Sequence, residues 1–175
     1  MEQNKRLSKA LAALLKTLRQ FTSKDQTRPH LGLLAVDDNE VWATDGYRAI
    51  GVSLDYFGLE RLKGISGLVD AETFVKQPDK SWLPQIKNLS KDRETPINVV
   101  IPKWMSRIRP TDKGAYVTIN LDGQLNLTGG DVTLDMKLLA PIADGEPWKV
   151  GSKGPLDPVI FKREGVMVII MPVRG

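Results

Sequence analysis

Three short segments rich in β-forming residues follow one another closely near the start of the chain, and they constrain the fold more than any other feature. They are LGLLAV (31–36), EVWAT (40–44) and YRAIGVSL (47–54). The turn-forming residues Asp37-Asp38-Asn39 and Asp45-Gly46 separate them. β-Rich runs joined by such residues are typical of hairpins. The sequence therefore predicts a small antiparallel meander.

An amphipathic helix is predicted directly before this meander, from Lys5 to Phe21. Its apolar residues recur at spacings of three and four, the period of a helix with one buried face: Leu7, Leu11, Leu14, Leu15, Leu18 and Phe21. Five cations fall on the opposite side, with no acid among them after Glu2: Lys5, Arg6, Lys9, Lys16 and Arg19. For a helix considered alone, a solvated surface face is the simplest interpretation of these charges.

The rest of the chain predicts a second helical region followed by strands. DAETFVKQ (70–77) is expected to be a helix with Asp70 as its N-cap and Pro78 at its end, and a further helical stretch runs from Trp82 to Leu89. The expected strands are ISGLVD (65–70), INVVIP (97–102), AYVTINLD (115–122), QLNLTG (124–129), DVTLDMKLL (131–139), VIFKRE (159–164) and GVMVIIMPV (165–173). Asp122-Gly123 predicts a tight hairpin, and the Pro- and Gly-rich segment 141–158 a connection.

Length and composition set the class of protein. A chain of 175 residues with 41% hydrophobic residues suits one globular domain, 1–175, and the element order suggests an α+β unit of about 80 residues present twice within it. Its apolar runs fall short of the roughly 20 residues of a membrane span, and its start lacks the pattern of a secretory leader. We therefore expect a soluble cytoplasmic protein with no membrane partner. The net charge of +4 does not by itself identify a nucleic-acid binder.

Residues that carry enzyme chemistry are scarce in the sequence. Cysteine is absent and His30 is the single histidine, which excludes thiolate metal sites and multi-histidine sites. The glycine pairs lack the spacing of phosphate-binding loops. Asp37 and Asp38 are better explained as turn formers than as an acid–base pair. We expect a protein that is not an enzyme, with no cofactor, no metal and no catalytic residue.

The chain ends with VIIMPVRG (168–175), in which an apolar strand runs into Met171, Pro172 and Val173. A final core strand would account for the first residues of this segment. Methionine and proline beyond a strand can instead leave adaptable apolar surface, which suits the binding of varied peptides.

Two of these segments, and more weakly a third, resemble the bacterial replicative sliding clamp, the beta subunit of DNA polymerase III. LRQFTSKDQTRPHLGLLAVDDNEVWATDGYRAI (18–50) is similar to the start of the clamp's middle domain, with its motif ATDGHRL. PLDPVIFKREGVMVIIMPVRG (155–175) is similar to the clamp's C-terminus, which ends in YVVMPMRL. VTLDMKLLAPIADGEPW (132–148) is only weakly similar to the segment that closes such a domain.

The resemblance implies an α+β, DNA-clamp-like domain with two helices packed on antiparallel sheets. In a clamp ring the helices face the central hole and contact DNA phosphates without reading sequence. The resemblance therefore assigns duplex DNA as the partner of the basic helix face, through Lys5, Arg6, Lys9, Lys16 and Arg19.

The resemblance also implies an apolar groove that binds the short motif of DNA polymerases and other clamp partners. One wall would consist of Thr44, Gly46, Tyr47, Arg48 and Ala49, and the other of Ile170, Met171, Pro172, Val173 and Arg174. Tyr47 replaces the family's usual histidine, Ala49 a leucine and Gly175 the terminal leucine. The small Ala49 is expected to leave the groove shallower or wider on its side.

A bacterial clamp subunit has three such domains, whereas this chain has residues for one. Copies that assemble into a ring would make it a sliding-clamp-like processivity factor that encircles or contacts duplex DNA and tethers polymerase. The alternative is a monomeric adaptor or decoy that binds clamp-binding peptides, or a host clamp, without encircling DNA. The oligomeric state separates the two.

Overall fold

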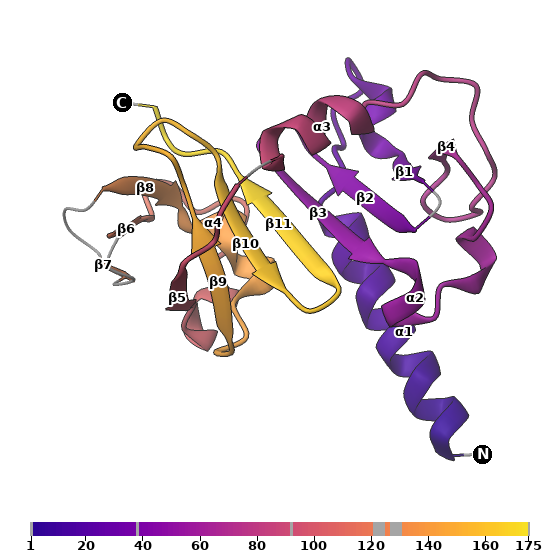
Figure 1. The fold of residues 1–175 in the computed structure, drawn as a ribbon, viewed down its shortest axis with the longest axis horizontal. Coiled ribbons are helices and arrows are strands. Elements are labelled where there is room, and N and C mark those ends of the chain that lie inside the picture. The colour runs from indigo at the N-terminus through magenta and orange to yellow at the C-terminus, as the bar shows by residue number, and fades with distance from the viewer. Residues whose placement is uncertain (1, 38, 92, 121–124, 127–130, 175) are drawn as a thin grey trace. The chain divides into compact units, whose positions relative to one another are not determined.

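The computed structural model describes residues 2–37, 39–91, 93–120, 125–126 and 131–174. It divides into two compact units, Met1–Ile86 and Lys87–Gly175, which are coloured indigo to magenta and magenta to yellow in Figure 1. Helices and antiparallel strands are present in both, so the predicted α+β class is confirmed. Within the described residues, no helix combines the length and the apolar character needed to cross a membrane.

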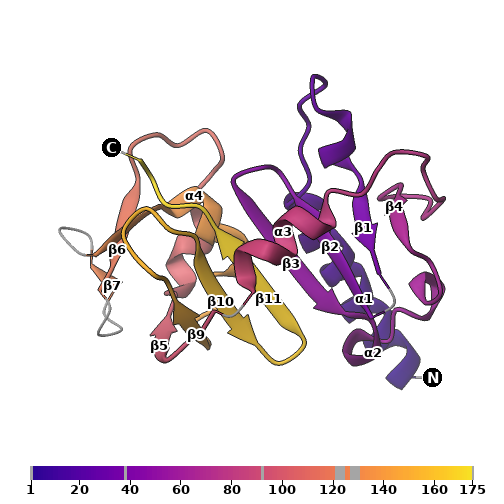
Figure 2. The same ribbon diagram turned by 45° about the horizontal axis from the view of Figure 1, so that its top comes forward.

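The first unit packs one long helix against a small antiparallel sheet. Its elements are α1 (Glu2–Gln20), η1 (Pro29–Gly32), β1 (Leu34–Val36), β2 (Glu40–Thr44), β3 (Arg48–Ser53), α2 (Leu54–Phe57), η2 (Glu60–Leu62) and β4 (Gly67–Val69), with strand order β4-β1-β2-β3. α1 lies against one face of these strands (Figures 1 and 2) and fully buries Leu18 and Phe21. The predicted helix and meander are confirmed, except that Leu31 and Gly32 belong to the 3-10 turn η1 and Leu54 begins α2.

Gly51 leaves room for the large side chain of Trp42 in the β2–β3 hairpin. The two residues are register partners in the β2–β3 hairpin, and both are buried. A Cβ atom at Gly51 would collide with the indole ring of Trp42, so the ring occupies the space that a side chain would need. The indole N–H donates to a carboxylate oxygen of Glu40 at 3.0 Å. The large side chain is therefore both buried and hydrogen-bonded.

The helix predicted for 70–77 is wrong, because the segment forms a turn that returns along β4. Asp70 does act as a cap: its Oδ1 accepts hydrogen bonds from the backbone N–H groups of Glu72 and Thr73 at 2.9 and 2.8 Å. Phe74 then adopts a left-handed conformation with φ of 58°, which ends helical growth. The Asp70 N–H donates to the carbonyl of Val75, and the chain runs back antiparallel. A local cap is thus compatible with a hairpin as well as with a helix.

The predicted stretch from Trp82 to Leu89 corresponds to α3 (Leu83–Ser90), which contains the boundary between the two units. The side-chain oxygen of Ser81 accepts from the Leu83 N–H at 3.2 Å and starts the helix. Trp82, directly before it, is buried and donates its indole N–H to the carbonyl of His30 at 3.0 Å. α1 and α3 are the two longest helices in the described part of the chain.

The second unit is dominated by antiparallel strands. Its elements are β5 (Ile97–Val100), η3 (Lys103–Arg107), β6 (Tyr116–Ile119), β7 (Leu125–Asn126), β8 (Val132–Asp135), α4 (Met136–Leu139), η4 (Ala140–Ile142), β9 (Pro147–Gly151), β10 (Val159–Arg163) and β11 (Val166–Ile170). β11, β10, β9 and β5 follow one another in that order, and β7-β6-β8 form a separate sheet (Figure 1). The predicted Asp122-Gly123 turn lies outside the described residues.

Two predictions for this unit are wrong. The strand expected over 131–139 ends at Asp135, whose side chain accepts from the Lys137 N–H at 3.1 Å and starts the short helix α4. The connection expected over 141–158 contains β9, which pairs with both β10 and β5. In β9 the buried Trp148 and Val150 alternate with exposed residues, as in a half-buried strand. At its end, a Cβ atom on Gly151 would collide with the backbone of Glu94.

Candidate functional site

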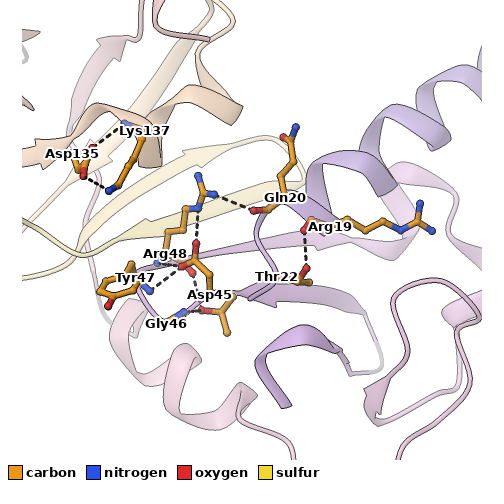
Figure 3. Close-up of polar contacts among 10 residues, drawn as sticks. Arg19, Gln20, Thr22, Asp45, Gly46, Tyr47, Arg48, Asp135 and Lys137 are labelled. Atoms are coloured by element: carbon orange, nitrogen blue, oxygen red, sulfur yellow. Dashed lines mark hydrogen bonds and ion pairs between the residues drawn. The ribbon is translucent and has the colours of Figure 1, made fainter. Parts of the chain in front are cut away.

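The segment Thr44–Ala49, predicted as one wall of a groove, forms a tightly hydrogen-bonded turn between β2 and β3 (Figure 3). Asp45 Oδ1 accepts from the backbone N–H groups of Tyr47 and Arg48 at 2.9 and 3.0 Å. The Thr44 hydroxyl donates to the Arg48 carbonyl at 2.7 Å and accepts from the Gly46 N–H at 3.1 Å. Gly46 has φ of 92°, a conformation that glycine adopts without strain. The predicted Asp45-Gly46 turn is confirmed.

Arg48 ties this turn to the end of α1. Its Nε donates to Asp45 Oδ2 at 3.0 Å and one terminal nitrogen donates to the carbonyl of Gln20 at 3.0 Å (Figure 3). The guanidinium also lies over the ring of Phe21, 4.6 Å from its centroid. Only 11% of the side chain is exposed. Arg48 therefore holds the turn in place, and it offers little surface to a partner.

Exposure separates the members of this turn into two groups. Tyr47 is 61% exposed and Gly46 is also exposed, whereas Thr44 and Ala49 are each 2% exposed. The aromatic ring that replaces the family's histidine is thus the reachable side chain of the turn. The small Ala49 belongs to the core.

The second predicted wall follows β11. Ile170 ends the strand opposite Val159 and is fully buried. Met171 and Val173 are half-buried, Pro172 is buried and Arg174 is exposed. The Val173 N–H donates to the carbonyl of Thr133 at 2.9 Å. The backbone of the apolar tail is therefore hydrogen-bonded to β8 at Val173.

The two predicted walls belong to different units, 1–86 and 87–175. Each is a separate ordered feature of the described structure. That they form one peptide-binding groove stays a prediction.

The basic face of α1 is exposed where the structure describes it. Lys9, Lys16 and Arg19 all lie on the exposed side, while Lys5 and Arg6 belong to the same helix but their side chains lie outside the described residues. Arg19 is partly engaged, since its Nε donates to the carbonyl of Ala71 at 3.1 Å. Lys9 and Lys16 therefore offer the more accessible charges.

Asp70 lies beside this helix end and remains a carboxylate. Hydrogen bonds from the backbone of Thr73 and Glu72 lower its pKa below the usual 3.8, and the nearby charge of Arg19 adds a smaller effect in the same direction. An anionic partner of α1 would meet this negative charge next to Arg19. The part of the helix around Lys9 and Lys16 is better suited to phosphate contact.

Residues considered for catalysis have structural roles in the described part of the chain. Asp37 Oδ1 accepts from the backbone N–H groups of Asn39 and Glu40 at 3.1 and 2.9 Å, as expected of a turn former; Asp38 lies outside the described residues. His30 is exposed on η1. Among the described residues, no group of three or more His, Asp or Glu side chains is placed to hold a metal ion.

One exposed surface was missing from the predicted sites. It lies on η3 and the loop after it, where Trp104 is 49% exposed among basic side chains. The signal in the sequence is KWMSRIRP (103–110), in which cations surround an aromatic residue.

No protein-family model matches the chain, and no curated protein matches it by sequence. Solved structures do. The beta sliding clamp of Caulobacter crescentus matches with a TM-score of 0.63 at 15% identity, covering 95% of this chain and 64% of the clamp. The Helicobacter pylori beta clamp, solved with a DNA ligase peptide, gives 0.57 at 12%, covering 94% and 63%. The Bacillus subtilis DNA polymerase sliding clamp gives 0.52 at 16%, covering 93% and 62%.

These structural matches show that the chain has an α+β, clamp-like fold. More particularly, the fold is that of the bacterial DNA polymerase III beta sliding clamps. The resemblance predicted from residues 18–50 and 155–175 is thereby confirmed for the fold. The chain spans less than two thirds of the length of the clamps that it matches.

Proposed function

We propose that this chain is a sliding-clamp-like, non-enzymatic accessory protein of DNA replication. It contacts duplex DNA through α1 and tethers polymerase or other replication proteins by a short peptide motif. The observation that carries the proposal is the clamp fold, found together with the ordered turn at Thr44–Ala49 that resembles the clamp motif ATDGHRL. A fold match to a clamp solved with a DNA ligase peptide supports a protein partner of this kind.

The peptide site in this proposal divides into contact residues and supporting residues. Gly46, Tyr47, Met171, Val173 and Arg174 are at least partly exposed and would touch the peptide. The remaining members of the two walls are buried or mostly buried and would hold these contacts in place: Thr44, Arg48, Ala49, Ile170 and Pro172.

The apolar anchor of the peptide would supply most of the affinity. Burying one leucine-sized side chain contributes about 1.5–3 kcal/mol, and methionine adapts its shape to different anchors. Because Ala49 lies in the core, the exposed ring of Tyr47 decides the preference on the first wall. We therefore expect partner motifs with an aromatic or aliphatic residue that packs on this ring.

A peptide-binding experiment tests this site. The probe is a fluorescent peptide with the sequence of the H. pylori DNA ligase peptide, followed by anisotropy. Tyr47→Ala and Met171→Ala should each weaken binding about tenfold, which corresponds to about 1.4 kcal/mol. Tyr56→Ala is the matched control, because Tyr56 is 54% exposed on α2 and lies outside the proposed site. If the peptide affinity is unchanged by both Tyr47→Ala and Met171→Ala, these residues do not form the peptide site.

The DNA surface in this proposal is the basic face of α1: Lys5, Arg6, Lys9, Lys16 and Arg19. Each phosphate neutralised releases counterions, so affinity falls with salt by a slope of about 0.9 per contact. Replacing Lys9 and Lys16 by Glu should weaken binding of a duplex and reduce the slope by about 2. Lys149→Glu, on the exposed side of β9, is the control. An unchanged salt slope in the Lys9 and Lys16 variants would indicate that the basic side of α1 is only a solvated surface.

The solution mass decides between the two forms of the proposal. A ring requires a stable oligomer. A strictly monomeric protein at roughly tens of micromolar that still binds the peptide would instead be the adaptor or decoy that does not encircle DNA.

A further inference from the structure

The exposed surface on η3 is built around Trp104. The short helix buries Met105, which is 2% exposed, and leaves Trp104 49% exposed. In a 3-10 helix, side chains three positions apart lie one above the other. Trp104 and the exposed Arg107 therefore share one side of η3. An aromatic ring and a guanidinium are presented together to solvent.

Basic side chains continue along the loop from η3 towards β6. Lys103, Arg107, Arg109 and Lys113 are all exposed. The one carboxylate in this segment, Asp112, accepts from the Arg109 backbone N–H at 2.8 Å and from its side chain at 3.1 Å. These hydrogen bonds lower the pKa of Asp112, the backbone bond most of all. The other three cations have no carboxylate partner among the described residues.

Two acids of another segment, Asp144 and Glu146, also lie near Lys103. They flank Gly145, where a Cβ atom would lie 3.9 Å from that of Lys103. Asp144 is already bound by the guanidinium of Arg163 at 2.6 and 3.1 Å. Of these two acids, Arg163 therefore neutralises Asp144, and Glu146 is left beside the four cations of the segment.

Trp104 differs from every other tryptophan of the chain. Trp42, Trp82 and Trp148 are 2%, 8% and 3% exposed and belong to the core. Tryptophan contributes most to stability when its large ring is buried, so part of that contribution is given up at Trp104. A ring kept at the surface between cations has the chemistry that stacks on a nucleobase while the cations contact phosphates.

We propose that Trp104 and Arg107, together with Lys103, Arg109 and Lys113, form a contact site for single-stranded nucleic acid. Stacking on Trp104 requires a base whose face is open, and the bases of a duplex are already stacked on one another. The site lies wholly within the second unit, whereas the basic face of α1 belongs to the first. It is thus a second nucleic-acid surface with a different preference, and it does not depend on the peptide site.

The test measures binding of a labelled oligothymidylate by fluorescence anisotropy, on the full chain. Trp104→Ala should weaken binding about tenfold or more, Trp104→Phe should restore part of the loss because it keeps a ring, and Arg107→Ala should lower the salt slope by about 0.7. Tyr56→Ala is the control for an exposed ring elsewhere. Intrinsic fluorescence gives an independent reading, since the oligonucleotide can reach Trp104 alone among the four tryptophans.

Three outcomes would overturn the proposal. One is an oligothymidylate affinity that is the same in Trp104→Ala as in the parent. Another is a duplex of the same length that binds more tightly than the oligothymidylate and whose affinity is lost in Trp104→Ala, which would place the duplex at this site. The third is quenching of Trp104 by the clamp-binding peptide and not by the oligonucleotide, which would make η3 a peptide surface. The loss of oligothymidylate affinity caused by Trp104→Ala should be the same in the parent and in the Lys9→Glu, Lys16→Glu double variant, so failure here is distinguishable from failure of the α1 proposal.

Discussion

Removing the Arg48 side chain is predicted to destabilise the first unit far more than removing a comparable surface arginine. The contacts that Arg48→Ala breaks include the ion pair with Asp45, the hydrogen bond to the Gln20 carbonyl and the packing over Phe21. These contacts join the β2–β3 turn to the end of α1. The substitution therefore removes contacts between two elements that are distant in sequence.

The magnitude follows from the burial of the pair. The side chains of Arg48 and Asp45 are 11% and 18% exposed. Hydrogen bonds to charged groups contribute about 1.5–3 kcal/mol, and breaking a fully buried pair costs about 3–5 kcal/mol. Asp45 keeps its two backbone hydrogen bonds after the substitution, so its charge is not left without donors. We expect the free energy of unfolding to fall by about 2–4 kcal/mol.

Urea denaturation, followed by far-UV circular dichroism and by tryptophan fluorescence, measures this loss. Arg28→Ala is the matched control, because Arg28 pairs with Asp25 at the same spacing and at 3.1 Å, but with 43% and 37% of the side chains exposed. Exposed pairs contribute little, so the control should stay close to the parent. Arg48→Lys should lose most of what Arg48→Ala loses, since lysine lacks the fork that reaches two acceptors. Equal stability of Arg48→Ala and Arg28→Ala would refute the reasoning.

Three further predictions concern the packing of the core and the loss of stability at acid pH. Gly51→Ala should lower the free energy of unfolding by at least about 1–3 kcal/mol, because the added Cβ collides with Trp42; an unchanged urea midpoint would contradict this. Gly151→Ala should be comparably destabilising, since its Cβ meets the backbone of Glu94, and a folded variant of parental stability would show that β5 and β9 are spaced differently. Burial raises the pKa of Asp144, but the hydrogen bonds from Arg163 and the Glu146 N–H outweigh it and hold the pKa below 3.8. The ionised Asp144 therefore stabilises the folded state above the carboxyl's unfolded pKa, and this stabilisation is lost as pH falls through the folded pKa. Asp144→Asn should accordingly make the decline of Tm below about pH 4 less steep than in the parent. A decline of equal steepness in both proteins would contradict this prediction.

Local signals in the sequence predicted α1 and the β2–β3 hairpin of the first unit well. The period of apolar residues through Leu18 and Phe21 gave the buried face of α1, and Asp45-Gly46 gave the hairpin turn, because both depend on residues close together in the chain. The role of Arg48 could not be predicted in this way. Its partners include the Gln20 carbonyl, 28 residues away, which only the folded chain brings near.

The predictions failed where a local signal is compatible with two structures. Asp70 caps a turn as readily as a helix, and the left-handed Phe74 decided for the turn. β9 was hidden by flanking glycines and prolines, although Trp148 and Val150 alternate with exposed residues as a strand requires. Its place between β10 and β5 comes from pairing across the unit, which no short window of sequence contains.

Tethering itself is the central claim, and one measurement tests it directly. Duplex DNA is immobilised on beads, and retention of the fluorescent clamp-binding peptide is measured with and without the protein. We predict that the peptide is retained only when the protein is present, and that retention is lost in Met171→Ala and in the Lys9→Glu, Lys16→Glu double variant. A protein that binds the peptide in solution but leaves none on the DNA would contradict the account.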